Sequence, residues 1–326
     1  MTLSSRALYR VAAVTAILAA AWIFVPRFGT ESNLINLLRQ AFLLALVATG
    51  VSLTMLVAGL DLSIGAVAAL SSCLAATVIV QGHVALGVLV ALAVGALGGL
   101  LNGVMIAKLK LPFFIMTFSM MFIVRGLALT YTQGTSIHGF PQSFTWLGKS
   151  FVGPVPMPVV LGGAVLGLLY LVLTKTTFGR ITYAVGANAE AARFSGLAAD
   201  RNLIRVYALS GLLASLSGLI YIARLNAADA DLGMMWPLEG IAVAVIGGIA
   251  FSGGEGNILG LILGGIVMAV VGNCVNLLGL PARFQDFFIG FVIILVVLVD
   301  HLTQKRGKVA KSLAVHSHSV AKEGGP

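Results

Sequence analysis

The sequence predicts an all-α, polytopic integral membrane protein that forms one domain over residues 1–326. Hydrophobic residues make up 59% of the chain and charged residues only 10%, against roughly 25% charged residues in soluble domains. The mean hydropathy is +1.04, and long apolar runs recur along nearly the whole chain. This composition leaves little of the chain for a separate globular domain.

Ten apolar runs predict about ten transmembrane helices, which together cover residues 11–300. A helix satisfies its backbone hydrogen bonds internally, as the hydrocarbon core requires, and a span needs about 20 residues. The runs are 11–25, 41–60, 64–81, 84–107, 112–131, 154–173, 205–223, 237–251, 258–278 and 284–300.

Two of these runs are unusual. The first follows Arg6 and Arg10 and contains LAAA, which leaves a cleaved signal peptide open. Because these alanines lie mid-run with WIFV still to follow, we favour an uncleaved span. The eighth, LEGIAVAVIGGIAF, is short and broken by glycine, so it predicts a discontinuous or re-entrant helix covered by protein.

The basic residues predict the orientation. Of the 20 Lys and Arg residues, 14 fall in segments that the order of spans places on one side. The positive-inside rule then puts both termini in the cytoplasm, with a long cytoplasmic loop at about 174–204 and a cytoplasmic tail at 301–326. The net charge of +9 is therefore an orientation signal and does not indicate nucleic acid binding.

Some glycines are spaced four residues apart, which lets helix backbones approach closely. We expect them to pack within the bundle rather than to form a dimer contact. They are Gly95, Gly99 and Gly103, Gly163 and Gly167, and Gly260 and Gly264. A faint internal repeat also relates GLDLSIG at 59–65 to GIAFSGG at 248–254.

Motifs for enzyme chemistry are missing. LGKS at 147–150 resembles the end of a phosphate-binding loop, but Ser143 occupies the position of its first glycine. His316 and His318 have no third ligand nearby, so no metal site is predicted. An intramembrane enzyme is therefore disfavoured.

Polar residues in the spans are mostly neutral, which suits a path for an uncharged, hydroxyl-rich solute. No acidic residue or histidine lies mid-span, which argues against an ion-coupled secondary carrier, the alternative function. Asp61 either caps the following helix or lines the path, and Arg125 either snorkels or contacts solute. The candidate path residues are Asp61, Ser63, Asn102, Thr117, Asn273 and Asn276.

The segment GANAEAARFSG at 186–196 predicts a short helix in the long cytoplasmic loop. Asn188 is placed to cap it, Glu190 and Arg193 lie one turn apart, and Gly196 can end it in a left-handed conformation. A small apolar side is formed by Ala187, Ala191 and Phe194. Such a helix fits a groove on a soluble partner; the alternative is a helix lying on lipid.

On the outer side, LNAADADLG at 225–233 carries Asp229 and Asp231. These carboxylates either meet basic residues of a docking protein or are simply solvated.

The chain resembles the ribose-type permease subunits of bacterial sugar ABC importers over nearly its whole length. The resemblance rests on VAGLDLSIGAVAALSS, LPFFIMTFSMMFIVRGLALTYTQG, FGRITYAVGANAEAARFSGL, YALSGLLASLSGLIYIARL and IAVAVIGGIAFSGGEGNILG. It implies that the cytoplasmic loop docks into an ATPase through Gly186, Asn188, Glu190, Ala191, Arg193, Ser195 and Gly196. In place of the ELDAIA usual in this group, the chain has PLEGIAVA, with Glu239 and Gly240.

The resemblance also implies the function and the partners. We expect a permease without enzymatic activity or cofactor of its own, in the bacterial inner membrane. The expected partners are an ATP-binding subunit with two nucleotide sites, which holds ATP and Mg, an extracytoplasmic sugar-binding protein and a second permease, identical or paralogous.

Overall fold

A computed structural model describes residues 3–281, 283–294 and 298. The helices are α1 (Leu3–Phe24), α2 (Glu31–Leu56), α3 (Ile64–Val80), α4 (Val84–Lys108), α5 (Phe113–Thr132), α6 (Gln142–Lys149), α7 (Met157–Lys175), α8 (Thr177–Ala187), α9 (Ala189–Phe194), α10 (Ala199–Leu225), α11 (Trp236–Gly247) and α12 (Gly260–Leu277). Residues 283–294 are also helical. The tail 301–326, with His316 and His318, lies outside the described residues.

Two minimal antiparallel sheets complete the described structure. β1 (Ile137–His138) pairs with β4 (Ala227–Ala228), with Ile137 opposite Ala228. β2 (Phe151–Val152) pairs with β3 (Val155–Pro156) in a hairpin. Because these strands have only two residues each, the predicted all-α class is confirmed.

The helices agree with the predicted runs in position but not always in length. Within the described residues, six helices are long and apolar enough to cross a membrane: α2, α4, α5, α7, α10 and α12. Three further apolar helices are shorter: the part of α1 from Arg10 to Phe24, α3 and α11. The chain is therefore polytopic, while length and composition alone select fewer spans than ten.

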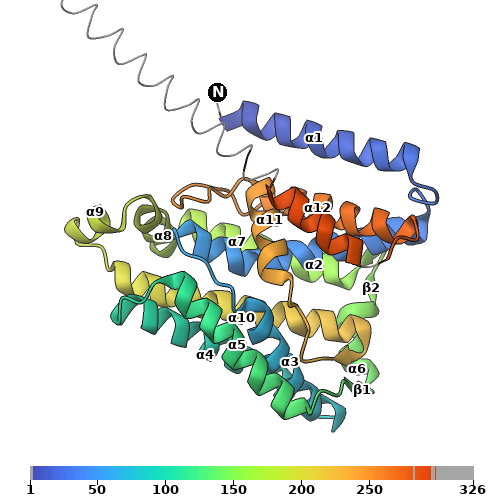
Figure 1. The fold of residues 1–326 in the computed structure, drawn as a ribbon, viewed down its shortest axis with the longest axis horizontal. Coiled ribbons are helices and arrows are strands. Elements are labelled where there is room, and N and C mark those ends of the chain that lie inside the picture. The colour runs from blue at the N-terminus through green and yellow to red at the C-terminus, as the bar shows by residue number, and fades with distance from the viewer. Residues whose placement is uncertain (1–2, 282, 295–297, 299–326) are drawn as a thin grey trace, which may run out of the picture.

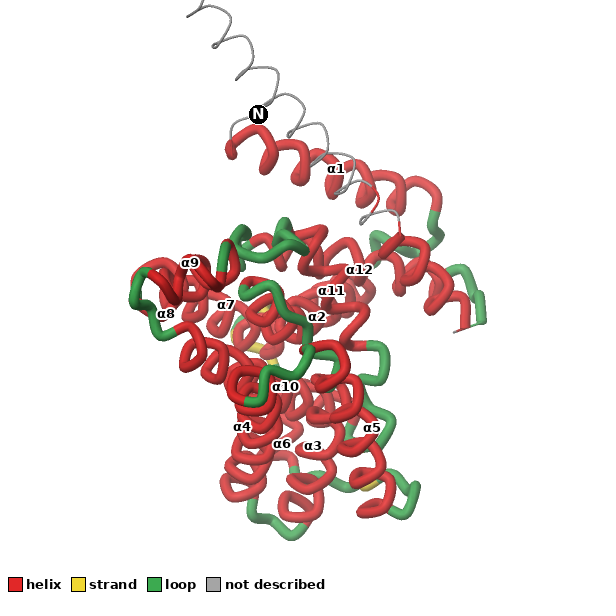
Figure 2. Tube along the Cα trace, turned by 60° about the vertical axis from the view of Figure 1, so that its left-hand side comes forward, coloured by secondary structure: helices red, strands yellow, loops and turns green. Residues whose placement is uncertain are grey.

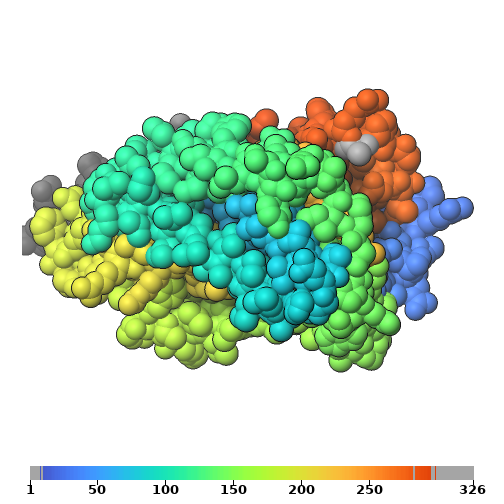
Figure 3. Space-filling model, turned by 90° about the horizontal axis from the view of Figure 1, so that it is seen from below, coloured from blue at the N-terminus to red at the C-terminus, as the bar shows by residue number. Residues whose placement is uncertain are grey.

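α10 and α2 form the centre of the bundle. The most apolar window of α10 is 72% buried and that of α2 is 61% buried, against 22% for α4 and 17% for α5. α10 packs on α4, α2 and α3, and α5 packs mainly on α3. Figure 3 shows α3, α4 and α5 across much of one face of the molecule, with α1 at its right-hand edge.

Glycine permits the close contact of α4 with α10. A Cβ at Gly99 would overlap the carbonyl of Tyr207, and Gly95 faces the carbonyl of Gly211. At Gly103 a Cβ would lie 2.8 Å from Ile204 Cα. The predicted packing role of this glycine triplet within the bundle is confirmed.

The other two glycine pairs behave differently from each other. Gly260 and Gly264 lie against the backbone of α11 at Gly247 and Val243, so they pack as predicted. Gly163 touches only Phe42, 3.7 Å from the position of its Cβ, and Gly167 has no described neighbour within 4 Å. The packing prediction is wrong for Gly167, because that side of α7 faces away from the other described helices.

α11 is a short, buried helix, as the glycine-broken eighth run predicts. It has 12 residues, so it is roughly 18 Å long, less than the roughly 30 Å hydrocarbon core. It packs on α2 and α12 and ends at Gly248, whose φ is 96°. Arg10 of α1 donates to the carbonyl of Gly247 at 3.3 Å, next to this end.

The loops gather at two ends of the bundle. Figures 1 and 2 place α8 and α9 at one end, which is also the end where α1 begins. α6, β1 and β2 lie at the opposite end (Figure 1). The segment 186–196 and the candidate docking loop at 225–233 therefore project from different ends.

Candidate functional site

α8 and α9 form an ordered, capped segment between α7 and α10. Asn188 ends α8 and begins α9, and its Oδ1 accepts hydrogen bonds from the backbone N–H of Glu190 at 3.0 Å and of Ala191 at 2.9 Å. After α9, Gly196 has a φ of 77°, and Leu197 N donates to Ala192 O at 3.0 Å. The predicted cap at Asn188 and left-handed end at Gly196 are confirmed.

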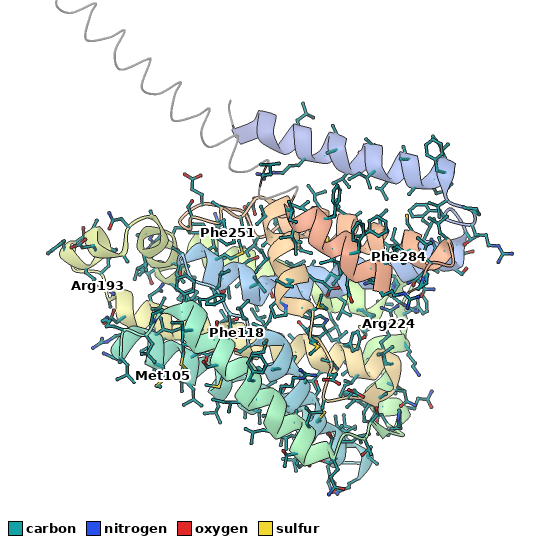
Figure 4. All side chains as sticks on the ribbon, in the orientation of Figure 1. Met105, Phe118, Arg193, Arg224, Phe251 and Phe284 are labelled. Atoms are coloured by element: carbon teal, nitrogen blue, oxygen red, sulfur yellow. The ribbon has the colours of Figure 1, made fainter. Side chains whose placement is uncertain are left out.

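One side of this segment is apolar and open. Ala187, Ala191 and Phe194 are exposed, whereas Ala192 is buried against the rest of the chain. Phe194 is 86% exposed, more than any other large hydrophobic side chain in the described part of the chain. Figure 4 shows Arg193 at the tip of the same projection.

Arg193 does not pair with Glu190, although their spacing suggests it. Arg193 NH2 lies 2.9 Å from Asp200 Oδ1, in the first turn of α10. α9 has only six residues, and its end lies beside the start of α10. The carboxylate of Asp200 is therefore within reach of the Arg193 guanidinium, and Arg193 pairs with it rather than with Glu190. Glu190 has no ion pair within the described structure.

Gly186 is buried, unlike the other six predicted coupling residues. A Cβ at Gly186 would overlap the carbonyl of Leu56 at the end of α2, and would lie 2.6 Å from Gly254 N. Gly254 N in turn donates to Leu56 O at 3.0 Å. Gly186 is therefore a close-packing position between α8, α2 and the loop before α12, and is not part of the open surface.

The same junction brings the second segment of the faint repeat close to the first in space. A Cβ at Gly253 would lie 2.7 Å from Ala58 N, so GIAFSGG packs directly against the connection between α2 and α3. The second repeat segment thus contacts the chain just before GLDLSIG.

Four of the six predicted path residues meet in the interior. Ser63 Oγ and Ser63 N donate to Asp61 Oδ1 at 2.6 and 3.0 Å, and Asn102 Nδ2 donates to Ser63 Oγ at 2.8 Å. Thr117 Oγ1 donates to the carbonyl of Leu60 at 3.4 Å. We call these four residues, with Ser210 and Tyr207, the polar cluster.

α10 supplies the two members that the sequence analysis did not select. Ser210 Oγ donates to Asp61 Oδ2 at 3.2 Å, and Tyr207 OH donates to Leu60 O at 3.1 Å. The cluster is closed in this conformation, since Asp61 is only 2% exposed and Asn102 is fully buried. Asn102 Oδ1 has no partner among the described residues.

Asp61 does not cap α3 in the expected manner. The N-cap of α3 is Ser63, and the Asp61 carboxylate accepts the Ser63 N–H before the helix begins. The Asp61 carboxylate accepts hydrogen bonds from Ser63 in the α2–α3 connection and from Ser210 in α10. It therefore orders the turn before α3 and also ties this turn to α10.

The remaining two path candidates lie elsewhere. Asn273 on α12 exchanges two hydrogen bonds with Asn33 on α2, at 2.7 and 3.0 Å. Asn276 is exposed. The structure therefore does not bring Asn273 or Asn276 to the polar cluster.

The two aspartates of the candidate docking loop, Asp229 and Asp231, are exposed but already bonded. Asp231 Oδ1 accepts from Arg125 Nε at 3.0 Å and NH2 at 2.7 Å, so the Arg125 guanidinium has a carboxylate partner within the chain. Asp229 Oδ2 accepts from Ser136 Oγ at 2.6 Å. The hydrogen bonds from the Ser136 hydroxyl and the Asp231 N–H hold the pKa of Asp229 below its usual value.

Comparison with known proteins identifies the family. The model of a family described as the permease component of the branched-chain amino acid transport system matches residues 33–297. The ribose import permease of Escherichia coli K12 is 38% identical over 284 residues, which are 86% of this chain and 88% of that protein. The chain belongs to the ribose-type permease family of ABC importers.

Two further relatives support this membership. The ribose import permease of Bacillus subtilis 168 is 38% identical over 278 residues, 84% of this chain and 86% of that protein. The galactose/methyl galactoside import permease of E. coli K12 is 32% identical over 303 residues, 87% and 90% of the two chains. No solved structure matches the chain.

Membership confirms the resemblance inferred from the motifs. The permease is a multi-pass protein of the inner membrane and a transport subunit rather than an enzyme, and its family works with an ATPase and a substrate-binding protein. Among the described residues, no group of three or more His, Cys, Asp or Glu side chains is placed to hold a metal ion.

The departure at Glu239 and Gly240 lies where α11 meets α2. A Cβ at Gly240 would lie 2.6 Å from Val51 Cγ2, so this permease brings α11 closer to α2 than an alanine would allow without a shift. Glu239 is 9% exposed in the first turn of the same helix. The close approach of α11 to α2 gives a structural reason for glycine at position 240.

Proposed function

We propose that the chain moves a neutral sugar, received from an extracytoplasmic binding protein, into the cytoplasm. The energy comes from a separate subunit with two nucleotide sites, which holds ATP and Mg, while this chain carries no cofactor. It pairs with a second permease, a copy or a paralogue. The observation that carries the proposal is the capped end of the segment α8–α9, where the exposed Phe194 and small alanines suit a groove on a soluble protein.

The proposed topology has about ten spans with both termini in the cytoplasm. The 14 basic residues on one side support it. In that arrangement α11 and α3 are short spans covered by their neighbours, and α8–α9 lies on the cytoplasmic side. The candidate docking loop with Asp229 and Asp231 then faces the binding protein.

The proposed solute is neutral because the polar cluster offers hydroxyl and amide groups around a single carboxylate. That carboxylate, Asp61, already accepts three hydrogen bonds from its own chain. Relatives named for ribose and for galactose or methyl galactoside import favour sugars. An allose transport permease of E. coli K12, 34% identical, extends the candidate set.

The test is reconstitution of the permease with its ATPase in proteoliposomes. D-Ribose, D-galactose, D-allose and L-leucine are each added with a candidate binding protein, and ATP hydrolysis and uptake are measured. We expect one sugar to stimulate both. Stimulation by L-leucine alone would contradict the sugar proposal. Uptake by the permease alone, under a proton or sodium gradient, would instead support an ion-coupled carrier.

A further inference from the structure

Asp200 bonds to two cations from different parts of the chain. Its Oδ1 accepts from Arg193 NH2 at 2.9 Å and from Lys110 Nζ at 3.1 Å, and its Oδ2 accepts from Lys110 Nζ at 3.0 Å. Arg193 belongs to α9, Asp200 to α10, and Lys110 to the connection between α4 and α5. One carboxylate therefore joins the predicted coupling segment to the entry of a membrane helix.

The backbone that carries Asp200 is firmly held. Its neighbours Ala199 and Asn202 are buried, and Asn202 Nδ2 donates to Thr182 Oγ1 of α8 at 3.1 Å. Farther along, α10 is the most buried of the candidate spans. Asp200 is thus a fixed point, whereas its two partners are on exposed segments.

The helix that follows Lys110 is the least enclosed candidate span. The most apolar window of α5 is only 17% buried, and Lys110 itself takes a left-handed conformation with a φ of 58° just before α5 begins. Near its start, Thr117 of the polar cluster donates to the Leu60 carbonyl. Displacement of the inner end of α5 would therefore change the polar cluster.

A solvated network without a role is the simpler explanation, since exposed ion pairs stabilise proteins little. Against it stands the arrangement of the pairs. Two ion pairs between described residues, Arg193 with Asp200 and Lys110 with Asp200, share one carboxylate. One joins α9 and the other joins the connection before α5 to the same carboxylate at the start of α10, so together they link the proposed docking segment with the entry of α5.

We propose that Asp200 is a positioning residue that transmits movement of α9, driven by the ATPase, to the inner end of α5. The inference rests on the proposed docking role of α8–α9. Loss of the carboxylate charge leaves docking intact, but α9 and α5 then move independently, so that ATP is hydrolysed with less transport.

The first test measures solute transported per ATP hydrolysed by the complete importer, with D-ribose, D-galactose and D-allose as probes. We expect Asp200→Asn to lower this ratio about two- to fivefold, the range that weak ion pairs permit, with normal ATPase retention. Lys110→Gln should lower it in the same direction, and Asp200→Glu should retain it. Glu31→Gln, an exposed carboxylate at the start of α2, is the matched control for charge loss.

The second test follows α5 without any solute. A fluorophore is placed at Phe114→Cys, an exposed position 53% accessible in the first turn of α5, with Cys73 and Cys274 replaced by alanine. ATP added to the complex should change its emission, and Asp200→Asn should remove most of that change. An unchanged transport ratio and an unchanged response in Asp200→Asn would overturn the inference.

The variant Ala191→Trp distinguishes failure of the proposed docking role from failure of the Asp200 inference. If Ala191→Trp leaves ATPase retention and transport intact, α8–α9 is not the docking segment and both proposals fail. If Ala191→Trp releases the ATPase while Asp200→Asn transports and responds normally, only the Asp200 inference is wrong.

Discussion

The carbonyl oxygen of Leu56 accepts a hydrogen bond from Gly254 N at 3.0 Å and leaves no room for a side chain at Gly186. The end of α2, the loop before α12 and α8 therefore meet through backbone atoms. This junction lies between the exposed α9 and the connection that carries Asp61.

The junction predicts that Gly186 tolerates no side chain. Gly186→Ala should lower the stability of the permease by about 1–3 kcal/mol, because the new Cβ must displace α8 from Leu56. Thermal unfolding in detergent measures the loss. Gly167→Ala is the matched control, since that position has no described neighbour within 4 Å. Equal unfolding temperatures for the two variants would contradict the close packing.

The open side of α9 predicts that added bulk blocks the ATPase. Ala191→Trp adds a ring to the exposed face, and Gly196→Val puts a β-branched residue at a φ of 77°. Both variants should insert at near-normal levels but lose co-purified ATPase and transport. Arg193→Ala should act more mildly, by no more than about 1 kcal/mol. Full ATPase retention by both bulky variants would remove the docking role.

The polar cluster predicts different roles for two asparagines that look alike in the sequence. Asn102→Ala removes the donor to Ser63 Oγ, and the lost buried hydrogen bond should cost about 1–3 kcal/mol. Uptake should fall with it. Asn276→Ala, at an exposed position, should change neither. Unfolding temperature and uptake are measured for both, and a larger effect at Asn276 would contradict the assignment.

The outer loop predicts a salt-dependent effect on the binding protein. Asp229→Asn with Asp231→Asn should reduce its stimulation of ATP hydrolysis several-fold at low ionic strength. The effect should shrink at about 1 M salt, where the screening length is about 3 Å. Arg125→Gln breaks the pair with Asp231 but leaves both carboxylates, so it should not reduce stimulation. Unchanged stimulation in the double variant at every ionic strength would contradict the docking role of these aspartates.

The proposed orientation predicts the activity of fused reporters. A reporter that works only outside the cytoplasm should be silent after Pro326 and active near Ser143, at the start of α6. α6 lies at the end opposite α9 (Figure 1). The reverse pattern would place α8–α9 outside and overturn the docking role.

The sequence by itself determined the features that depend on composition or on near neighbours. Low charge and long apolar runs predicted a polytopic helical protein, because a continuous apolar run of about 20 residues is long enough to cross the bilayer as a helix. The cap at Asn188 and the turn at Gly196 were predictable because their partners lie within a few residues along the chain.

Only the tertiary structure decided which distant groups meet. Ser210 is 149 residues from Asp61, and Asn273 is 240 residues from Asn33, so spacing along the chain carries no signal for either contact. The same holds for Arg193, which pairs beyond its helix with Asp200. Equal spacing even concealed opposite outcomes: Gly99 lies against α10, whereas Gly167 faces open space. The rotation of each helix in the bundle decides between them, and that rotation is set by packing against the other helices.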